Sequence, residues 1–239
     1  MKTKLYCVFN IKTFICLFFI CTLTVAIIFS MNIYSVSVIS ENISENDKCV
    51  IIDAGHGGED GGTQSADGVL EKDINLSISL KIDEILRSLG IKTVLIRDGD
   101  YMIYDEDSNT IRQKKVSDIH NRKKYMDEYK SSIFLSIHQN YFIESKYSGA
   151  QVFYSKNDDL SPEIAQSIQD SIRNNIQPEN ERKIKQSGTE IYLLYYATVP
   201  TVMVECGFLS NKNETENLVT DEYQKKIAFS IVEGILNYL

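Results

Sequence analysis

The sequence predicts an α/β protein, a three-layer sandwich with a mainly parallel twisted β-sheet, and three observations support this prediction. Short apolar runs typical of buried strands alternate with segments whose apolar residues recur at helical spacing. The composition, with 43% apolar and 24% charged residues, is that of a globular protein. A Gly-rich loop directly follows the first predicted strand. We therefore expect functional side chains beyond the carboxyl ends of the strands.

The first part of the chain is predicted to be an export segment that lies in a membrane. Residues 1–34 contain the uncharged stretch Thr13–Ser30, which at 18 residues is about long enough to cross a bilayer. Lysines precede this stretch, which places the amino terminus in the cytoplasm and the rest of the chain outside. A buried core helix is the alternative, but the stretch has no polar face. An anchor retained in the membrane is favoured over a cleaved signal, because Ser35-Val36-Ser37 is a poor cleavage site.

The rest of the chain is expected to be a linker over residues 35–48 and one domain over residues 49–239. The net charge is −8 for the whole chain and −11 beyond residue 40, where 22 basic and 33 acidic residues lie. This charge argues against a nucleic-acid partner, since binding phosphates takes clustered Lys and Arg. Cys49 and Cys206 lie in apolar runs, so two buried thiols are expected rather than a disulfide.

Strands are predicted at the short apolar runs. The first run ends at Asp53 and leads into the Gly-rich loop. The predicted strands are Cys49–Ile52, Thr93–Ile96, Ser132–His138, Ala150–Tyr154, Glu190–Leu194 and Thr201–Glu205.

Helices are predicted between these strands, where apolar residues recur every three or four positions. The predicted helices are Lys72–Leu89, Asn109–Tyr129, Ser161–Asn174 and Asp221–Tyr238. Gly90 fits the left-handed residue that follows a helix end, and Ser161 is expected as the N-cap before Pro162. Alternating strands and helices imply that the sheet is mainly parallel.

Two of the three histidines of the chain are expected at the functional edge of this sheet. His56 follows the first strand and His138 closes the third, while His120 falls inside a helix and is expected to be a surface or packing residue. Glu71 starts the helix that follows the His56 loop. Two imidazoles and a carboxylate suit zinc with one position left open. A Glu that only favours the positive end of its helix is the alternative for Glu71.

The Gly-rich loop could instead suggest a nucleotide site, but its details oppose that interpretation. In Asp53–Gly62, Asp60 occupies the position of the third glycine of a G-x-G-x-x-G pattern, and no Gly-Lys-Ser/Thr follows. Glycines here favour close approach of the backbone to a ligand. Glu205 closes a late strand on the same edge and is expected to move a proton from a water molecule to a leaving nitrogen. The alternative is a carboxylate bonded to a neighbouring backbone amide.

Four segments together resemble a known family, the zinc-dependent N-acetylmuramoyl-L-alanine amidases that cut peptidoglycan. They are DAGHGGEDGG at 53–62, LEKDINL at 70–76, SIHQN at 136–140 and VECGFLSN at 204–211. The resemblance implies one catalytic domain with a six-stranded sheet flanked by helices. It also implies Zn²⁺ held by His56, Glu71 and His138, with Glu205 as the catalytic acid and base. The substrate would be a peptidoglycan glycan strand with its stem peptide, cut between N-acetylmuramic acid and L-alanine.

The arrangement of an export anchor followed by this domain is most similar to spore-cortex, germination-type members of the family. That similarity implies action outside the cytoplasmic membrane, in the cortex space of the forespore, during formation of muramic δ-lactam. An activating or accessory protein is a further hypothesis. Two alternatives stay open: a non-catalytic peptidoglycan-binding protein on the same fold, and another zinc hydrolase such as a carboxypeptidase or a deacetylase.

Three further residues stand at positions of interest in this resemblance. Gln139 follows a proposed zinc ligand, where the family usually has a small or apolar residue, so we expect it to change the hydrogen bonds around the site. Arg97 and Arg122 match recurrent family positions and are expected to be structural, holding loops or helix through ion pairs.

Overall fold

The computed structural model describes residues 18–24 and 48–239. The chain divides into two units, residues 1–43 and 44–239. In the first unit, residues 18–24 form a short helix. Within the described part of the chain, no helix is both long and apolar enough to cross a bilayer. Apart from residues 18–24 and 48, the predicted anchor and linker lie outside the described residues.

The second unit alternates strands and helices, as the sequence predicts. Its strands are β1 (Cys49–Ala54), β2 (Thr93–Leu95), β3 (Ser132–Asn140), β4 (Gln151–Tyr154), β5 (Lys185–Gln186) and β6 (Thr201–Phe208). Its helices are α2 (Glu71–Ser88), α3 (Ile111–Glu128), α4 (Leu160–Asn175), α5 (Tyr192–Tyr195), α6 (Lys212–Leu218) and α7 (Asp221–Ile235), and a 3₁₀ turn follows at Leu236–Tyr238.

The strands form one six-stranded sheet in the order β2-β1-β3-β6-β4-β5. The neighbours β2, β1, β3 and β6 are parallel, so β1, β3 and β6 end at the same edge. The strand β4 runs antiparallel to β6 and therefore starts at that edge. A register shift lies between His138 and Asn140 of β3. The mainly parallel sheet confirms the predicted fold class.

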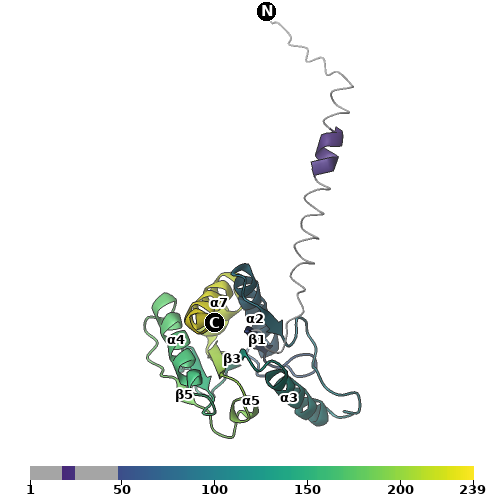
Figure 1. Ribbon diagram of the computed structural model, residues 1–239. Coiled ribbons are helices and arrows are strands. Elements are labelled where there is room, and N and C mark those ends of the chain that lie inside the picture. Colours follow the sequence, from purple (N-terminus) through teal and green to yellow (C-terminus); the bar gives the residue numbers. More distant parts are fainter. Residues whose placement is uncertain (1–17, 25–47) are drawn as a thin grey trace, which may run out of the picture. The chain divides into compact units, whose positions relative to one another are not determined.

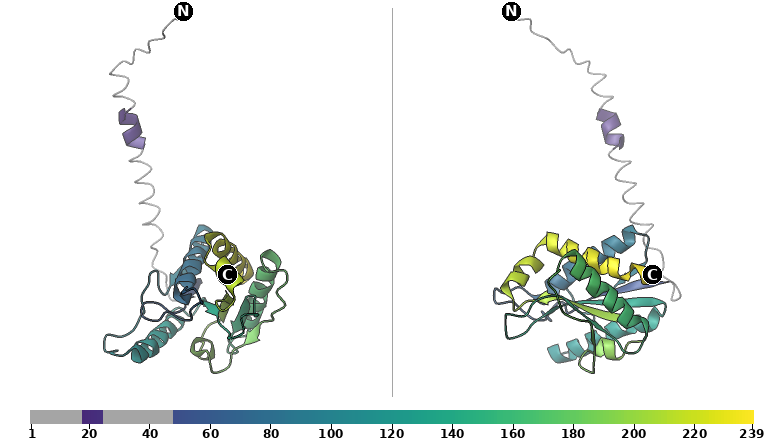
Figure 2. Two further views of the ribbon diagram at one scale, coloured as in Figure 1. Left: turned by 180° about the vertical axis from the view of Figure 1, so that it is seen from behind. Right: turned by 90° about the vertical axis from the view of Figure 1, so that its left-hand side faces the viewer.

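Helices cover both faces of the sheet (Figure 1). The helices α2, α4 and α7 bury one apolar cluster, to which β1 contributes Val50 and Ile52. The helices α3 and α5 bury the other, to which β1 contributes Ile51. The views in Figure 2 show the same three layers from behind and from the side. Alternate strand residues thus point into different layers, which explains why the strands are continuously apolar.

The structure corrects two local predictions. The predicted strand Glu190–Leu194 is wrong: this region contains the one-turn helix α5. A helical turn places the adjacent Leu193 and Leu194 in the same apolar cluster, whereas successive strand residues point to opposite faces. Ser161 is not the N-cap of α4. It lies inside the helix, and its Oγ accepts a hydrogen bond from the Thr201 backbone N–H at 2.9 Å.

Candidate metal centre and active site

Three of the predicted site residues converge at the carboxyl edge of the sheet. His56 lies in the loop after β1, His138 lies near the end of β3, and Glu71 is the first residue of α2. One ligand atom from each side chain lies within 4.8 Å of the other two. We call these three residues the metal cluster. Side chains far apart in the sequence meet here because β1 and β3 are parallel neighbours.

Glu71 lies between the two imidazoles. Its Oε1 is 2.9 Å from His138 Nδ1, and its Oε2 is 3.3 Å from His56 Nε2. Burial opposes ionisation, but the two histidines outweigh it and hold the pKa of Glu71 well below its usual range. The Thr63 backbone N–H also donates to Oε2, at 2.8 Å. Glu71 therefore contacts the glycine loop and both histidines. Its role is not limited to a favourable interaction with the positive end of its own helix.

Two glycines leave the space that the metal cluster occupies. A Cβ at Gly55 would lie 2.2 Å from His138 Nε2. A Cβ at Gly62 would lie 2.6 Å from Glu71 Oε2 and 2.7 Å from His56 Cδ2, and Gly62 has a φ of +68°. The glycine loop therefore approaches the three side chains closely, and its predicted approach to a bound ligand stays a prediction.

His56 is oriented by Asp60, a partner that the sequence argument did not identify. The distance from His56 Nδ1 to Asp60 Oδ2 is 2.9 Å, and Lys115 Nζ lies 2.6 Å from the other carboxylate oxygen. Burial lowers the pKa of His56, but the bonds to Asp60 and Glu71 outweigh it and raise that pKa to about 9. The sequence signal that could have identified this partner is an acidic residue four positions after the histidine. Such outer carboxylates commonly orient metal-binding histidines.

Arg122 holds the backbone that carries His56. Its guanidinium forms a buried ion pair with Asp53 and a second one, at 2.6 Å, with Asp118. It also donates to the carbonyl oxygens of Ala54 at 2.8 Å and His56 at 2.7 Å. Arg122 therefore forms the structural ion pairs that the sequence predicts.

Arg97 holds the same loop in a different way. This buried guanidinium donates to backbone carbonyls at 2.8–3.0 Å, including those of Ala54, Gly55 and Lys72. Among the described residues no carboxylate pairs with it, so the predicted ion pair is wrong for Arg97. Carbonyl oxygens take the place of a counter-ion, because the glycine loop turns several of them inward.

Gln139 takes part in the hydrogen bonds behind the metal cluster, as expected from its position. Its backbone N–H donates to Glu71 Oε1 at 3.0 Å, and its side-chain amide donates to Asn75 Oδ1 at 3.1 Å. Asn75 in turn donates to Glu71 Oε1 at 3.3 Å. These bonds hold the same carboxylate oxygen of Glu71 that His138 Nδ1 contacts.

Glu205 lies on β6 directly opposite His138 of β3. Its Oε2 is buried, and neither carboxylate oxygen accepts a hydrogen bond from any described residue. The alternative of a carboxylate bonded to a backbone amide is therefore not what the structure has. Burial raises the pKa of Glu205 to about 7, and the nearby histidines act in the opposite direction. This carboxyl group can hold or release a proton near neutral pH.

A cavity of about 460 Å³ gives access to this region. It is lined by His56, His138 and Glu205, by Lys115 and Ile119 of α3, and by residues 190–193 before and in α5. His120 does not line it: this exposed side chain packs on Tyr192, with ring centroids 5.0 Å apart. Cys49 and Cys206 are buried thiols, as predicted. Burial, followed by the charge of Glu205, raises the pKa of Cys206.

Comparisons with known proteins show which family the chain resembles. A family model described as N-acetylmuramoyl-L-alanine amidase, Amidase_3, matches residues 50–237. The germination-specific N-acetylmuramoyl-L-alanine amidase of Bacillus subtilis is 34% identical over 191 residues, which are 80% of this chain and 79% of that protein.

Solved structures are also similar. The CwlD amidase of Clostridioides difficile, solved in complex with the GerS lipoprotein, has 42% identity and a TM-score of 0.77, and the match covers 80% of this chain and 98% of that chain. The amidase AmiC2 of Nostoc punctiforme has 28% identity and a TM-score of 0.69, with 82% and 98% covered.

Proposed function

The chain belongs to the N-acetylmuramoyl-L-alanine amidase family, and from that premise we propose that its site is a zinc centre served by one separate carboxyl group. The protein is a hydrolase of peptidoglycan. It cleaves the amide bond between N-acetylmuramic acid and L-alanine of the stem peptide. The observation that carries the zinc proposal is the convergence of two imidazoles and a carboxylate beside an uncommitted carboxyl group.

The metal cluster fits Zn²⁺. Imidazole nitrogen and carboxylate oxygen are common zinc ligands, and a catalytic zinc site has three protein ligands and one open position. His56, Glu71 and His138 would supply the three ligands. The glycines at 55 and 62 leave these side chains room to approach one another. When bound, Zn²⁺ acts as a Lewis acid that polarises the scissile carbonyl and makes a water molecule easier to deprotonate.

The proposed role of Glu205 is to carry the proton. Its carboxylate would accept a proton from the attacking water and then, as the carboxylic acid, donate it to the leaving nitrogen of L-alanine. A pKa near 7 suits both steps, because neither protonation state is strongly disfavoured at neutral pH. The lack of hydrogen bonds to other described residues supports this role, since the group is not committed elsewhere.

The proposed setting is the spore cortex. The Bacillus subtilis relative is named germination-specific, and the Clostridioides difficile relative was solved with a lipoprotein. By analogy, this amidase acts outside the cytoplasmic membrane, in the cortex space of the forespore, where it prepares muramic δ-lactam formation. Its amino-terminal segment anchors it in the membrane, and a membrane-attached lipoprotein is its accessory partner.

The test uses the purified full chain with zinc on peptidoglycan. The expected results are about one zinc per chain and new amino termini of L-alanine, detected by mass spectrometry. Glu205→Gln should lower activity by about 10²- to 10⁴-fold and keep the zinc, because the amide cannot accept the proton. Glu222→Gln, at an exposed position in the first turn of α7, is the matched control and should keep full activity. Release of terminal D-alanine, or an active E205Q variant, would contradict the proposal.

A further inference from the structure

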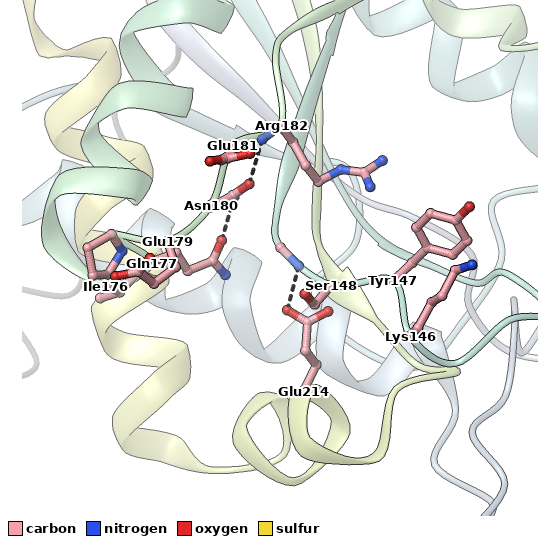
Figure 3. Close-up of a pocket in the computed structure, with 12 residues that line it drawn as sticks. Lys146, Tyr147, Ser148, Ile176, Gln177, Glu179, Asn180, Glu181, Arg182 and Glu214 are labelled. Atoms are coloured by element: carbon pink, nitrogen blue, oxygen red, sulfur yellow. Dashed lines mark hydrogen bonds between the residues drawn. The ribbon is translucent and has the colours of Figure 1, made fainter.

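A second cavity, of about 650 Å³, lies between residues 146–149, residues 176–182 and α6. Figure 3 shows the Arg182 side chain extending from its loop toward the side of this cavity that holds Tyr147. The guanidinium carbon lies 4.9 Å from the centroid of the Phe208 ring. The Arg182 guanidinium therefore packs on the ring of Phe208 at the end of β6.

Arg182 is connected to the strand next to Glu205. Its Nη2 donates a hydrogen bond to Gln151 Oε1. Gln151 on β4 is the register partner of Glu205 on β6. Directly opposed residues of antiparallel strands place their side chains on the same face of the sheet. Arg182 and Gln151 therefore extend the active-site face by one strand, away from His56.

Within the described part of the chain, the charge of Arg182 is not matched by a direct ion pair, and Glu214 and Glu205 act on it only from a distance. Among residues 18–24 and 48–239, no carboxylate forms an ion pair with it, and its Nε is buried without a hydrogen-bond partner. Glu214, whose charge acts most strongly on Arg182, accepts hydrogen bonds from the backbone N–H groups of Gly149 at 2.9 Å and Phe208 at 2.8 Å. Burial lowers the pKa of Arg182. A partly buried cation without a partner is costly, and the free energy is recovered when an anion binds.

We propose that Arg182 binds a free carboxylate of the stem peptide, on the leaving-group side of the scissile amide. This proposal rests on the proposed function. Glu205 delivers its proton to the leaving nitrogen, and in this proposal the peptide beyond that nitrogen extends past β6 toward β4. Neighbouring strands lie about 4.8 Å apart, and an extended residue spans about 3.5 Å. The second residue of the stem therefore reaches the Gln151–Arg182 pair, and its carboxylate matches the planar guanidinium.

The alternative is that Arg182 only offsets the charges of Glu205 and Glu214. That role would change activity on every substrate by the same factor. Recognition of a carboxylate changes activity only on substrates that carry one. The two roles are therefore separated by a pair of substrates that differ in this group alone.

The experiment compares glycan-linked L-Ala–D-Glu with the same compound whose α-carboxylate is an amide. Wild-type enzyme should prefer the free carboxylate by about 10- to 100-fold in kcat/KM, as expected for charge-assisted hydrogen bonds. Arg182→Gln should remove this preference, mainly through a higher KM for the carboxylate substrate. Lys146→Gln removes an exposed cation from the same cavity and is the matched control, which should keep the preference.

Zinc content and circular dichroism verify that each variant is folded. If R182Q does not fold, Arg182→Lys keeps the charge, loses the planar fork and should retain an intermediate preference. Calorimetry of the free peptides L-Ala–D-Glu and its α-amide tests the subsite without turnover. An equal loss on both substrates, or equal binding of both peptides, would overturn the proposal. Absence of cleavage of either substrate, with preferential binding of the carboxylate peptide, would instead count against the proposed reaction.

Discussion

Replacing Gly62 by alanine tests whether the glycines of the His56 loop are there to make room for the metal cluster. The added Cβ would lie 2.6 Å from Glu71 Oε2, whereas real Cβ contacts are essentially never below 3.0 Å. At least one proposed ligand must therefore move by about 0.4 Å. Zinc–ligand distances tolerate only about 0.2 Å. We expect G62A to lower zinc affinity by about 10- to 100-fold or more, the loss seen when the groups around a metal are disturbed.

The backbone contributes a separate cost, which a second glycine isolates. Gly62 has a φ of +68°, so alanine there also costs about 1–2 kcal/mol of folding free energy. Gly90, after α2, has a φ of +77° and nothing within 4 Å of its Cβ position. G90A therefore carries the same backbone cost without touching the metal cluster. The comparison separates strain of the chain from displacement of the ligands.

The assay has two parts. Urea unfolding of the chelator-treated proteins should show a similar loss of about 1–2 kcal/mol for both variants, with any excess in G62A caused by the ligand contact. Zinc competition titrations should then show a lower affinity for G62A and a wild-type affinity for G90A. Wild-type zinc affinity in G62A would refute the inference that Gly62 makes room for the zinc ligands.

Two further predictions concern protonation and the support of the loop. Zinc must displace the proton that His56 holds with a pKa of about 9, so zinc affinity should rise about tenfold per pH unit from pH 7 until about pH 9 and then level off. A zinc affinity that does not change over that range would contradict the pairing of His56 with Asp60 and Glu71. Arg122→Gln should cost about 3–5 kcal/mol in urea unfolding because it leaves Asp53 buried without its cation, whereas Arg112→Gln on the exposed face of the same helix should change stability by less than about 0.5 kcal/mol.

Much of the site could be predicted because its chemistry follows from where strands end. His56, His138 and Glu205 each come at or just after the end of an apolar run, and parallel strands bring their carboxyl ends to one edge. His120 could be set aside for the same reason, since it lies within a helix. The local errors arose where tertiary contacts outweigh local signals, as at Ser161, whose hydroxyl bonds to β6 and does not cap its helix.

Other features could not be read from spacing along the chain. Asp60 contacts His56 because the glycine loop folds back and places Nδ1 toward it. Arg97 finds carbonyl oxygens where an acid was expected, since the inward-turned backbone of the loop is not encoded in any pattern of residue types.

Residue chemistry along the chain was therefore enough to predict the alternation of strands and helices, the edge of the sheet where the proposed site lies and a set of side chains that suits zinc. Hydrophobic periodicity and strand ends are local properties, and they can be read from the sequence without knowledge of the fold. Only the tertiary structure decided that Glu205 is left without a hydrogen bond, that Gly62 must lack a Cβ, and that Arg182 lies one strand away from the reacting groups. Those facts depend on strand register and on the directions of side chains that meet across the fold.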